Sequence, residues 1–150
     1  MSLLKGLMVD TKSAWVEYPG LRGFEVEIAN IPRAQLIKLR KACTISKFDR
    51  KTKQPVESLD EEKYVSEFTK AAIKDWKGLT LGKLEQLVLI DIGSKSPDTN
   101  VPFTMEDAEL LVANSGDFDS WLTDAVFDLE NFRTEPAGGV VGKAGEVASE

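Results

Sequence analysis

Residues 14–29 read AWVEYPGLRGFEVEIA, and this stretch decides the fold that we expect. Apolar and charged side chains alternate from Phe24 to Ile28, which is typical of a β-strand with one buried face. A Pro-Gly pair and a further glycine supply turn chemistry between this strand and a first strand around Trp15. We therefore predict a β-hairpin over residues 14–29, with Phe24, Val26 and Ile28 in the core and the intervening glutamates in water. Because a lone hairpin is only marginally stable, it has to pack against helices.

Helical spacing of apolar side chains predicts helices through much of the remaining chain. Asn30 is the expected cap of the first helix, and residues 58–61 have the pattern of a capping box for the second. Gly78 is a natural end for that second helix. The last helix has the clearest stripe, with apolar residues three and four positions apart from Phe118 to Phe132. The predicted helices span about residues 31–44, 58–77, 80–92, 104–113 and 117–133.

Two segments lack such spacing. Residues 44–58 contain the run KFDRKTKQP, which predicts a polar, basic loop. Residues 134–150 are rich in small residues and glutamate and hold no aromatic residue, which predicts a flexible, disordered C-terminal tail. The expected fold class is α+β and predominantly α-helical, with the N-terminal β-hairpin packed on a bundle of about five helices. Residues 1–133 would form a single globular domain.

The composition limits the chemistry that the chain can perform. The 150 residues include no histidine and one cysteine, Cys43. This excludes Ser-His-Asp and Cys-His nucleophilic sites, histidine-ligated zinc and iron–sulfur clusters. Cys43 falls within the apolar spacing of the first helix, so we expect it to be buried. The resulting expectation is a binding or assembly protein without catalytic residues or cofactors. Because a single cysteine cannot form an intrachain disulfide, a reducing cytoplasm is the expected compartment. No apolar run approaches the roughly 18 residues of a membrane span.

Charge is unevenly distributed along a chain whose net charge is −6. Residues 33–53 hold eight basic residues and one acidic residue, whereas residues 104–135 hold nine acidic residues and one basic residue. The two blocks have three interpretations: solvated surfaces, a nucleic-acid or phosphate site in the basic block, or head-to-tail association of basic and acidic faces. The basic block has a single aromatic residue, Phe48, and no glycine-rich loop, which makes nucleic-acid binding the weaker of the functional interpretations.

The remaining clusters fit structural roles better than chemical ones. Asp124 and Asp128 are one helical turn apart and, with the aspartates at 117 and 119, suggest a site for a hard metal. The glycine-turned loop and ligand spacing of a calcium site are missing, so we expect no metal. The three tryptophans, at positions 15, 76 and 121, each lie within an apolar pattern and are expected to anchor the core.

Several segments, taken together in order and spacing, resemble a known family. They are residues 15–32, the run KFDRKT at 47–52, Phe68 with IKDWKGLT at 73–80, FDSWL at 118–122 and LENF at 129–132. The family that they resemble is that of the tail assembly chaperones of long-tailed bacteriophages. The resemblance covers roughly residues 14–132.

The resemblance implies a non-catalytic role in the cytoplasm of the infected host and absence from the mature virion. Such chaperones coat and solubilise the long helical tape measure protein, associate with one another, and help recruit tail tube subunits, mainly through an extension made by ribosomal frameshifting. Gly142 and Lys143 can be encoded by a slippery G-run followed by an A-run. This chain would then be the short, coating product.

Charge position, rather than a family motif, selects the candidate partner-binding residues. We expect no catalytic, cofactor-binding or metal-binding residue. The alternative functions are a small nucleic-acid or phosphate-binding accessory protein that uses residues 33–53, and an enzyme that uses carboxylates with a hard metal. The candidate partner-binding residues are Arg40, Lys41, Arg50 and Lys51 on the basic side and Asp119, Asp124 and Asp128 on the acidic side.

Overall fold

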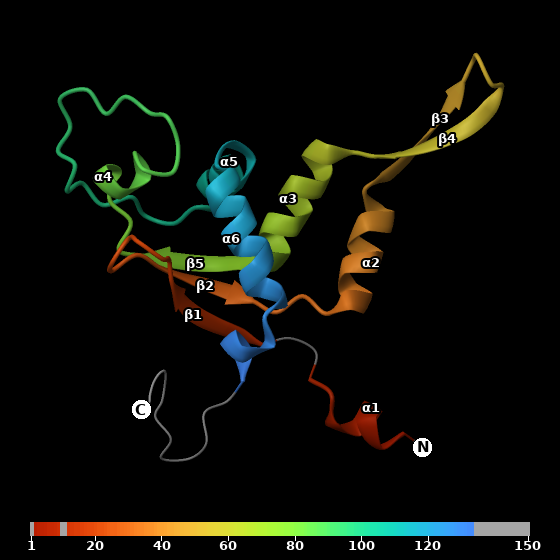
Figure 1. Cartoon of the computed structure of the whole chain (residues 1–150), viewed down its shortest axis with the longest axis horizontal. Coiled ribbons are helices and arrows are strands. Elements are labelled where there is room, and N and C mark those ends of the chain that lie inside the picture. The colour runs from red at the N-terminus through yellow and green to blue at the C-terminus, as the bar shows by residue number, and fades with distance from the viewer. Residues whose placement is uncertain (1, 10–11, 134–150) are drawn as a thin grey trace.

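The computed structural model describes residues 2–9 and 12–133. In Figure 1 a three-stranded sheet lies beneath helices, and two elements project from this body, a second β-hairpin and the N-terminal helix. The strands are β1 (Ser13–Glu17), β2 (Glu25–Ala29), β3 (Thr44–Asp49), β4 (Gln54–Leu59) and β5 (Ile73–Lys77). The helices are α1 (Leu3–Leu7), α2 (Arg33–Ala42), α3 (Glu61–Ala72), α4 (Leu81–Leu84), α5 (Met105–Asn114) and α6 (Gly116–Phe127), followed by the 3₁₀ helix η1 (Leu129–Phe132).

The predicted N-terminal hairpin is confirmed. β1 pairs antiparallel with β2, and β2 pairs antiparallel with β5, so β2 is the middle strand. Phe24, Val26 and Ile28 are fully buried, as the alternating pattern predicts. Glu25 is partly buried rather than in water, because β5 lies beside it and the Nζ of Lys77 comes within 3.9 Å of its carboxylate.

The core lies between the sheet and helices α3, α5 and α6, and its centre is aromatic. Tyr18 stacks on Phe118 at 5.8 Å between ring centroids, and Phe24 stacks on Phe118 at 6.3 Å. Trp76 is buried, as expected, but Trp15 is 40% exposed and holds the Nζ of Lys77 over its ring at 4.5 Å. The expectation that all three tryptophans anchor the core is therefore wrong for Trp15.

β5 replaces the end of the helix predicted over residues 58–77. The register between β2 and β5 shifts within the ladder, and Lys74 is skipped by it, which marks a β-bulge. The bulge brings Ile73 and Trp76, three positions apart, to the buried side of the same strand. Without the bulge, residues three apart would face opposite sides of the sheet, so their spacing in the sequence fits a helix instead.

The helix predicted over residues 80–92 is also shortened, to the single turn of α4. The N–H groups of its first turn, which have no acceptor within the helix, bond to the returning loop: that of Leu81 donates to the carbonyl of Thr99 and that of Gly82 to the carbonyl of Pro97, both at 2.9 Å. The helix predicted over 117–133 breaks after α6 and resumes as η1.

Two of the predicted helix caps are wrong. Asp60, and not Ser58, caps α3, because its carboxylate accepts a hydrogen bond from the N–H of Lys63 at 3.2 Å. The side chain of Asn30 donates instead to the carbonyl of Val126 at 3.0 Å, which ties the start of α2 to α6. α2 begins without a side-chain cap.

The basic loop predicted over residues 44–58 is a β-hairpin. β3 and β4 pair antiparallel in six register positions, from Thr44 opposite Leu59 to Asp49 opposite Gln54. Almost every residue of both strands is exposed, so the segment has no buried face to produce an alternating pattern. In Figure 1 this hairpin extends past the ends of α2 and α3.

The described residues are 44% helical and 22% strand, which confirms a mixed α and β structure. The predicted predominance of helix and the five-helix bundle are not confirmed. No described helix is long and apolar enough to cross a membrane. The predicted tail, residues 134–150, lies outside the described residues.

Candidate protein-interaction surfaces

The second hairpin carries two of the predicted basic residues, and we call residues 44–59 the arm. Arg50 and Lys51 lie in its turn and are exposed. Asp49 holds the turn, since its carboxylate accepts from the N–H of Lys51 at 2.9 Å and its carbonyl accepts from the N–H of Lys53 at 2.7 Å. The arm also exposes apolar surface, above all Phe48, which is 67% exposed. The arm therefore offers an aromatic side chain beside a cluster of cations.

Arg40 and Lys41 lie apart from the arm's turn, in the last turn of α2. The guanidinium of Arg40 lies 5.7 Å from the ring centroid of Tyr64 on α3. Burial raises the pKa of Tyr64, the charge of Arg40 lowers it, and the charge of Asp119 raises it. The charges of Arg40 and Asp119 thus act in opposite directions on the pKa of the same phenol.

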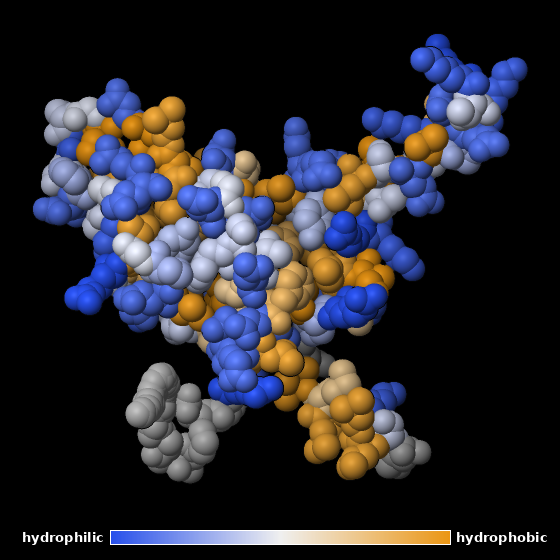
Figure 2. Space-filling model, in the orientation of Figure 1, coloured by the Kyte–Doolittle hydropathy of each residue, from blue (hydrophilic) through white to orange (hydrophobic). Residues whose placement is uncertain are grey.

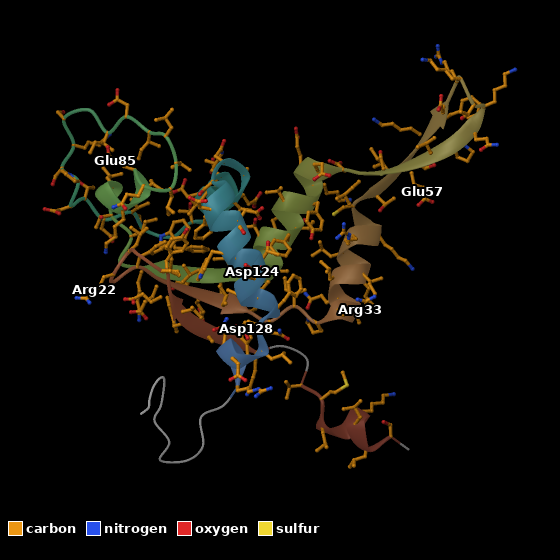
Figure 3. The ribbon with its side chains drawn as sticks, viewed as in Figure 1. Arg22, Arg33, Glu57, Glu85, Asp124 and Asp128 are labelled. Carbon is orange, nitrogen blue, oxygen red and sulfur yellow. The ribbon has the colours of Figure 1, made fainter. Side chains whose placement is uncertain are left out.

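The three acidic candidates lie on α6 and directly after it. Desolvation raises the pKa of Asp119, near the start of α6. Asp128 has a structural role, because its carboxylate caps η1 by accepting from the N–H of Glu130 at 3.0 Å. In Figure 3 Asp124 and Asp128 lie along and just below α6, and the arm, which carries Glu57, projects away from both.

A second acidic surface, absent from the prediction, lines a groove between α3 and α5. The groove has a volume of about 680 Å³. Apolar side chains line it, among them Val65, Met105, Leu110 and Ala113. Four glutamates line it as well, Glu61 and Glu62 from the first turn of α3 and Glu106 and Glu109 from α5. We call this the α3–α5 groove.

A cleft of about 450 Å³ shares Leu110 with the α3–α5 groove and is lined by residues of α5, of α4 and of the segment that follows α4. Leu89 and Leu110 line this cleft and are 104% and 55% exposed, so their side chains are open to a partner. Asp107 and Asn114 are the polar residues among those that line it; the others are apolar, including Trp76, Leu84 and Val88. We call this the apolar cleft.

α1 is a third apolar surface. Its leucines, Leu3, Leu4 and Leu7, are between 67% and 81% exposed, and Ser2 caps the helix by accepting from the N–H of Lys5. Figure 2 shows α1 as a hydrophobic cluster set apart from the body.

Within residues 2–9 and 12–133, no group of three or more histidine, cysteine or carboxylate side chains could hold a metal ion. Cys43 is fully buried, as predicted. What the described surface offers is apolar grooves and charged edges, which suit protein partners.

Comparison of the chain with known protein families, with curated proteins and with solved structures gave no match.

Sequence reasoning missed the α3–α5 groove because its glutamates have a sufficient local explanation. Acidic residues in the first turn of a helix interact favourably with the helix dipole, so Glu61 and Glu62 need no further explanation, while Glu106 and Glu109 are counted only as part of the acidic block of residues 104–135. Only the packing of α3 against α5 brings the two sets together. The excess of glutamate at both helix starts is the signal that could have pointed to the groove.

Proposed function

We propose that this chain is a phage tail assembly chaperone that coats the tape measure protein in the host cytoplasm and keeps it soluble until tail tube subunits assemble. The chain would leave before the virion is complete. The observation that carries the proposal is the apolar cleft, together with the sequence segments that resemble this family.

The apolar cleft suits a helical client. A long amphipathic helix exposes an apolar stripe that aggregates in water, and such a stripe binds in apolar grooves of other proteins. The cleft offers exposed leucines, Leu89 and Leu110, and two polar groups, Asp107 and Asn114, that can orient a helix. Many copies, each making one such weak contact, would hold a long client firmly through avidity.

Co-expression with the tape measure protein encoded in the same genome tests this function. We expect the chain to move the tape measure protein from the pellet to the soluble fraction. Leu89→Glu should abolish this effect without unfolding the chain, because Leu89 is fully exposed. Ile37→Glu is the matched control, since Ile37 is an exposed aliphatic residue on α2, 44% exposed and outside the cleft. Equal solubilisation by the wild type and Leu89→Glu would contradict the proposal.

The second candidate is nucleic-acid binding through residues 33–53, and one observation favours it. The arm is a two-stranded β-ribbon with cations in its turn, a shape that a DNA groove accepts. Its prediction is a gel retardation that falls steeply with salt concentration, because each phosphate contact releases a counterion. Retardation that is absent at low salt would remove this candidate.

A further inference from the structure

We propose that the arm of one copy docks in the α3–α5 groove of a second copy, so that the chains join head to tail. This contact deepens the proposed function, on which its role in coating a client rests. It is a surface-to-surface contact of unlike patches, which produces rings or open helical arrays rather than closed dimers.

The arm and the α3–α5 groove carry opposite charges. Four glutamates line the groove, from the first turn of α3 and from α5. The one cation that lines it, Lys70, already pairs with Glu67 at 3.6 Å. The turn of the arm supplies the opposite charge at its exposed end, through Arg50, Lys51 and Lys53. Opposed fields of this kind steer association and fix which surfaces meet.

The arm and the α3–α5 groove also both expose apolar side chains. Phe48 lies opposite Pro55 in the register of the arm, so the two side chains share one face close to the basic turn. The groove offers Val65, Met105 and Ala113 as an apolar surface for that face. An exposed aromatic residue flanked by cations has the composition of an interface hot spot, and the groove has the composition of its receptor.

The arm also needs a partner more than the rest of the fold does. Both of its faces are exposed, with Val56 46% exposed on the face opposite to that of Phe48. An isolated two-stranded hairpin is marginally stable in water, and docking would bury the apolar side chains that the arm now exposes.

The occupant of the groove is a second copy because the arm cannot reach the groove of its own chain. The base of the arm is fixed where the N–H of Asp60 donates to the carbonyl of Cys43 at 2.7 Å, beside the start of α3. From there the arm extends away from α5, as Figure 1 shows. At about 3.3 Å per residue, six paired positions carry the turn roughly 20 Å outward, toward a neighbouring molecule.

Sedimentation velocity over a range of protein concentrations tests the contact. We expect the wild type to self-associate, and high salt to weaken the association. Arg50→Glu/Lys51→Glu in the arm and Glu106→Lys/Glu109→Lys in the groove should each weaken it by about tenfold or more. Arg33→Glu/Lys38→Glu is the matched control, since it reverses two exposed cations of α2 outside the arm and should self-associate like the wild type.

Mixing the variants gives the sharpest readout. In the mixture the native arm of the groove variant meets the native groove of the arm variant, and the two reversed surfaces are also opposite in charge, so the mixture should regain the association that each variant loses alone. The chain that carries all four reversals should regain self-association, because the charges are again opposite. A wild type that stays monomeric, an arm variant that associates normally, or a mixture that stays monomeric would overturn the proposal. Loss of DNA retardation in the arm variant, with self-association unchanged, would assign the arm to nucleic acid instead.

The outcomes separate this contact from the proposed function. If the arm and groove variants stay associated while Leu89→Glu loses tape measure solubilisation, the contact fails and the chaperone function stands. If the charge reversals abolish association while Leu89→Glu has no effect, the contact stands and the chaperone function fails.

Discussion

Gly78 packs directly against the backbone of Gly23, so closely that a Cβ on Gly78 would lie 1.9 Å from the carbonyl oxygen of Gly23. This contact joins the end of β5 to the turn between β1 and β2. Gly78 also has φ +76°, a conformation that costs an L-residue about 1–2 kcal/mol. Gly78→Ala combines this strain with a displaced turn, and we expect it to lower the free energy of unfolding by about 2–5 kcal/mol, measured by urea titration.

Gly20→Ala separates the two effects in the same experiment. Gly20 has a similar φ of +86°, but a Cβ there would meet nothing within 4 Å. In this variant the free energy of unfolding should fall only by the cost of the left-handed backbone conformation, about 1–2 kcal/mol. Equal losses in the two variants would mean that the close approach to Gly23 contributes nothing.

Trp76 fastens the long loop after α4 to the sheet. Its indole N–H donates to the carbonyl of Val101 at 2.9 Å, and the ring meets that of Phe103 edge-on at 5.1 Å. Trp76→Phe keeps an aromatic ring but leaves the Val101 carbonyl without this donor, so we expect a loss of about 1–3 kcal/mol in a urea titration. Trp15→Phe is the control, because Trp15 is exposed and loses at most its contact with Lys77, about 1 kcal/mol or less.

Asp119 should make stability depend on pH. Because desolvation raises its pKa, the folded chain binds the proton more tightly than the unfolded chain does. The stabilisation from protonation is present below the usual pKa of aspartate and is lost as pH rises through the raised value. Asp119→Asn should therefore be more stable than the wild type at pH 7, by a small margin because the residue is exposed, and the difference should vanish near pH 3.

Thermal melts of the two chains at both pH values measure this effect. Asp124→Asn removes one negative charge from the same helix and controls for the change in net charge. A wild type that is more stable than Asp119→Asn at pH 7 would show that hydrogen bonding or the helix dipole outweighs desolvation at this carboxylate.

Cys43 reports on the base of the arm. Its side chain is fully buried, and its carbonyl accepts from the N–H of Asp60 at 2.7 Å. We expect a thiol reagent to label the native chain at least about a hundredfold more slowly than the chain in urea, because labelling requires an opening of the structure. Rapid labelling of the native chain would mean that the arm and its base open without unfolding the body.

The longer product implied by the family resemblance is testable in the gene. Gly142 and Lys143 lie outside the described residues, so the structure says nothing about them. A reporter fused in the −1 frame after Lys143 should be expressed, and a reading frame for a very long helical protein should follow. A silent reporter next to such a frame would remove only the longer product, whereas the absence of both would contradict the chaperone function.

The parts of the fold that local patterns determine could be predicted from the sequence. Phe24, Val26 and Ile28 alternate with charged residues, and nothing distant is needed to place them in a buried strand. β5 could not be predicted, because the bulge at Lys74 gives its buried residues, Ile73 and Trp76, a spacing that fits a helix. Tertiary pairing with β2 overrides the local preference there.

Neither the arm nor the α3–α5 groove could be predicted from the sequence, and the reasons differ. The arm has no buried face, so its strands show no hydrophobic alternation, and Arg50 and Lys51 look like part of a loop. The groove depends on residues from two helices that are distant in sequence. Of the predicted acidic residues, Asp128 caps η1 and Asp119 raises the pKa of Tyr64. Counting charges along the chain cannot distinguish such local roles from a role in binding.

The separation of the arm from the α3–α5 groove has a consequence for any assembly built from them. A row of copies joined in this way has polarity: one terminus presents a vacant groove and the other a free arm. Subunits could then be added at one terminus while the other is blocked or loses subunits. A displacing protein would need to recognise only one of these two termini. Removal of a coat could in this way proceed in a single direction along its client.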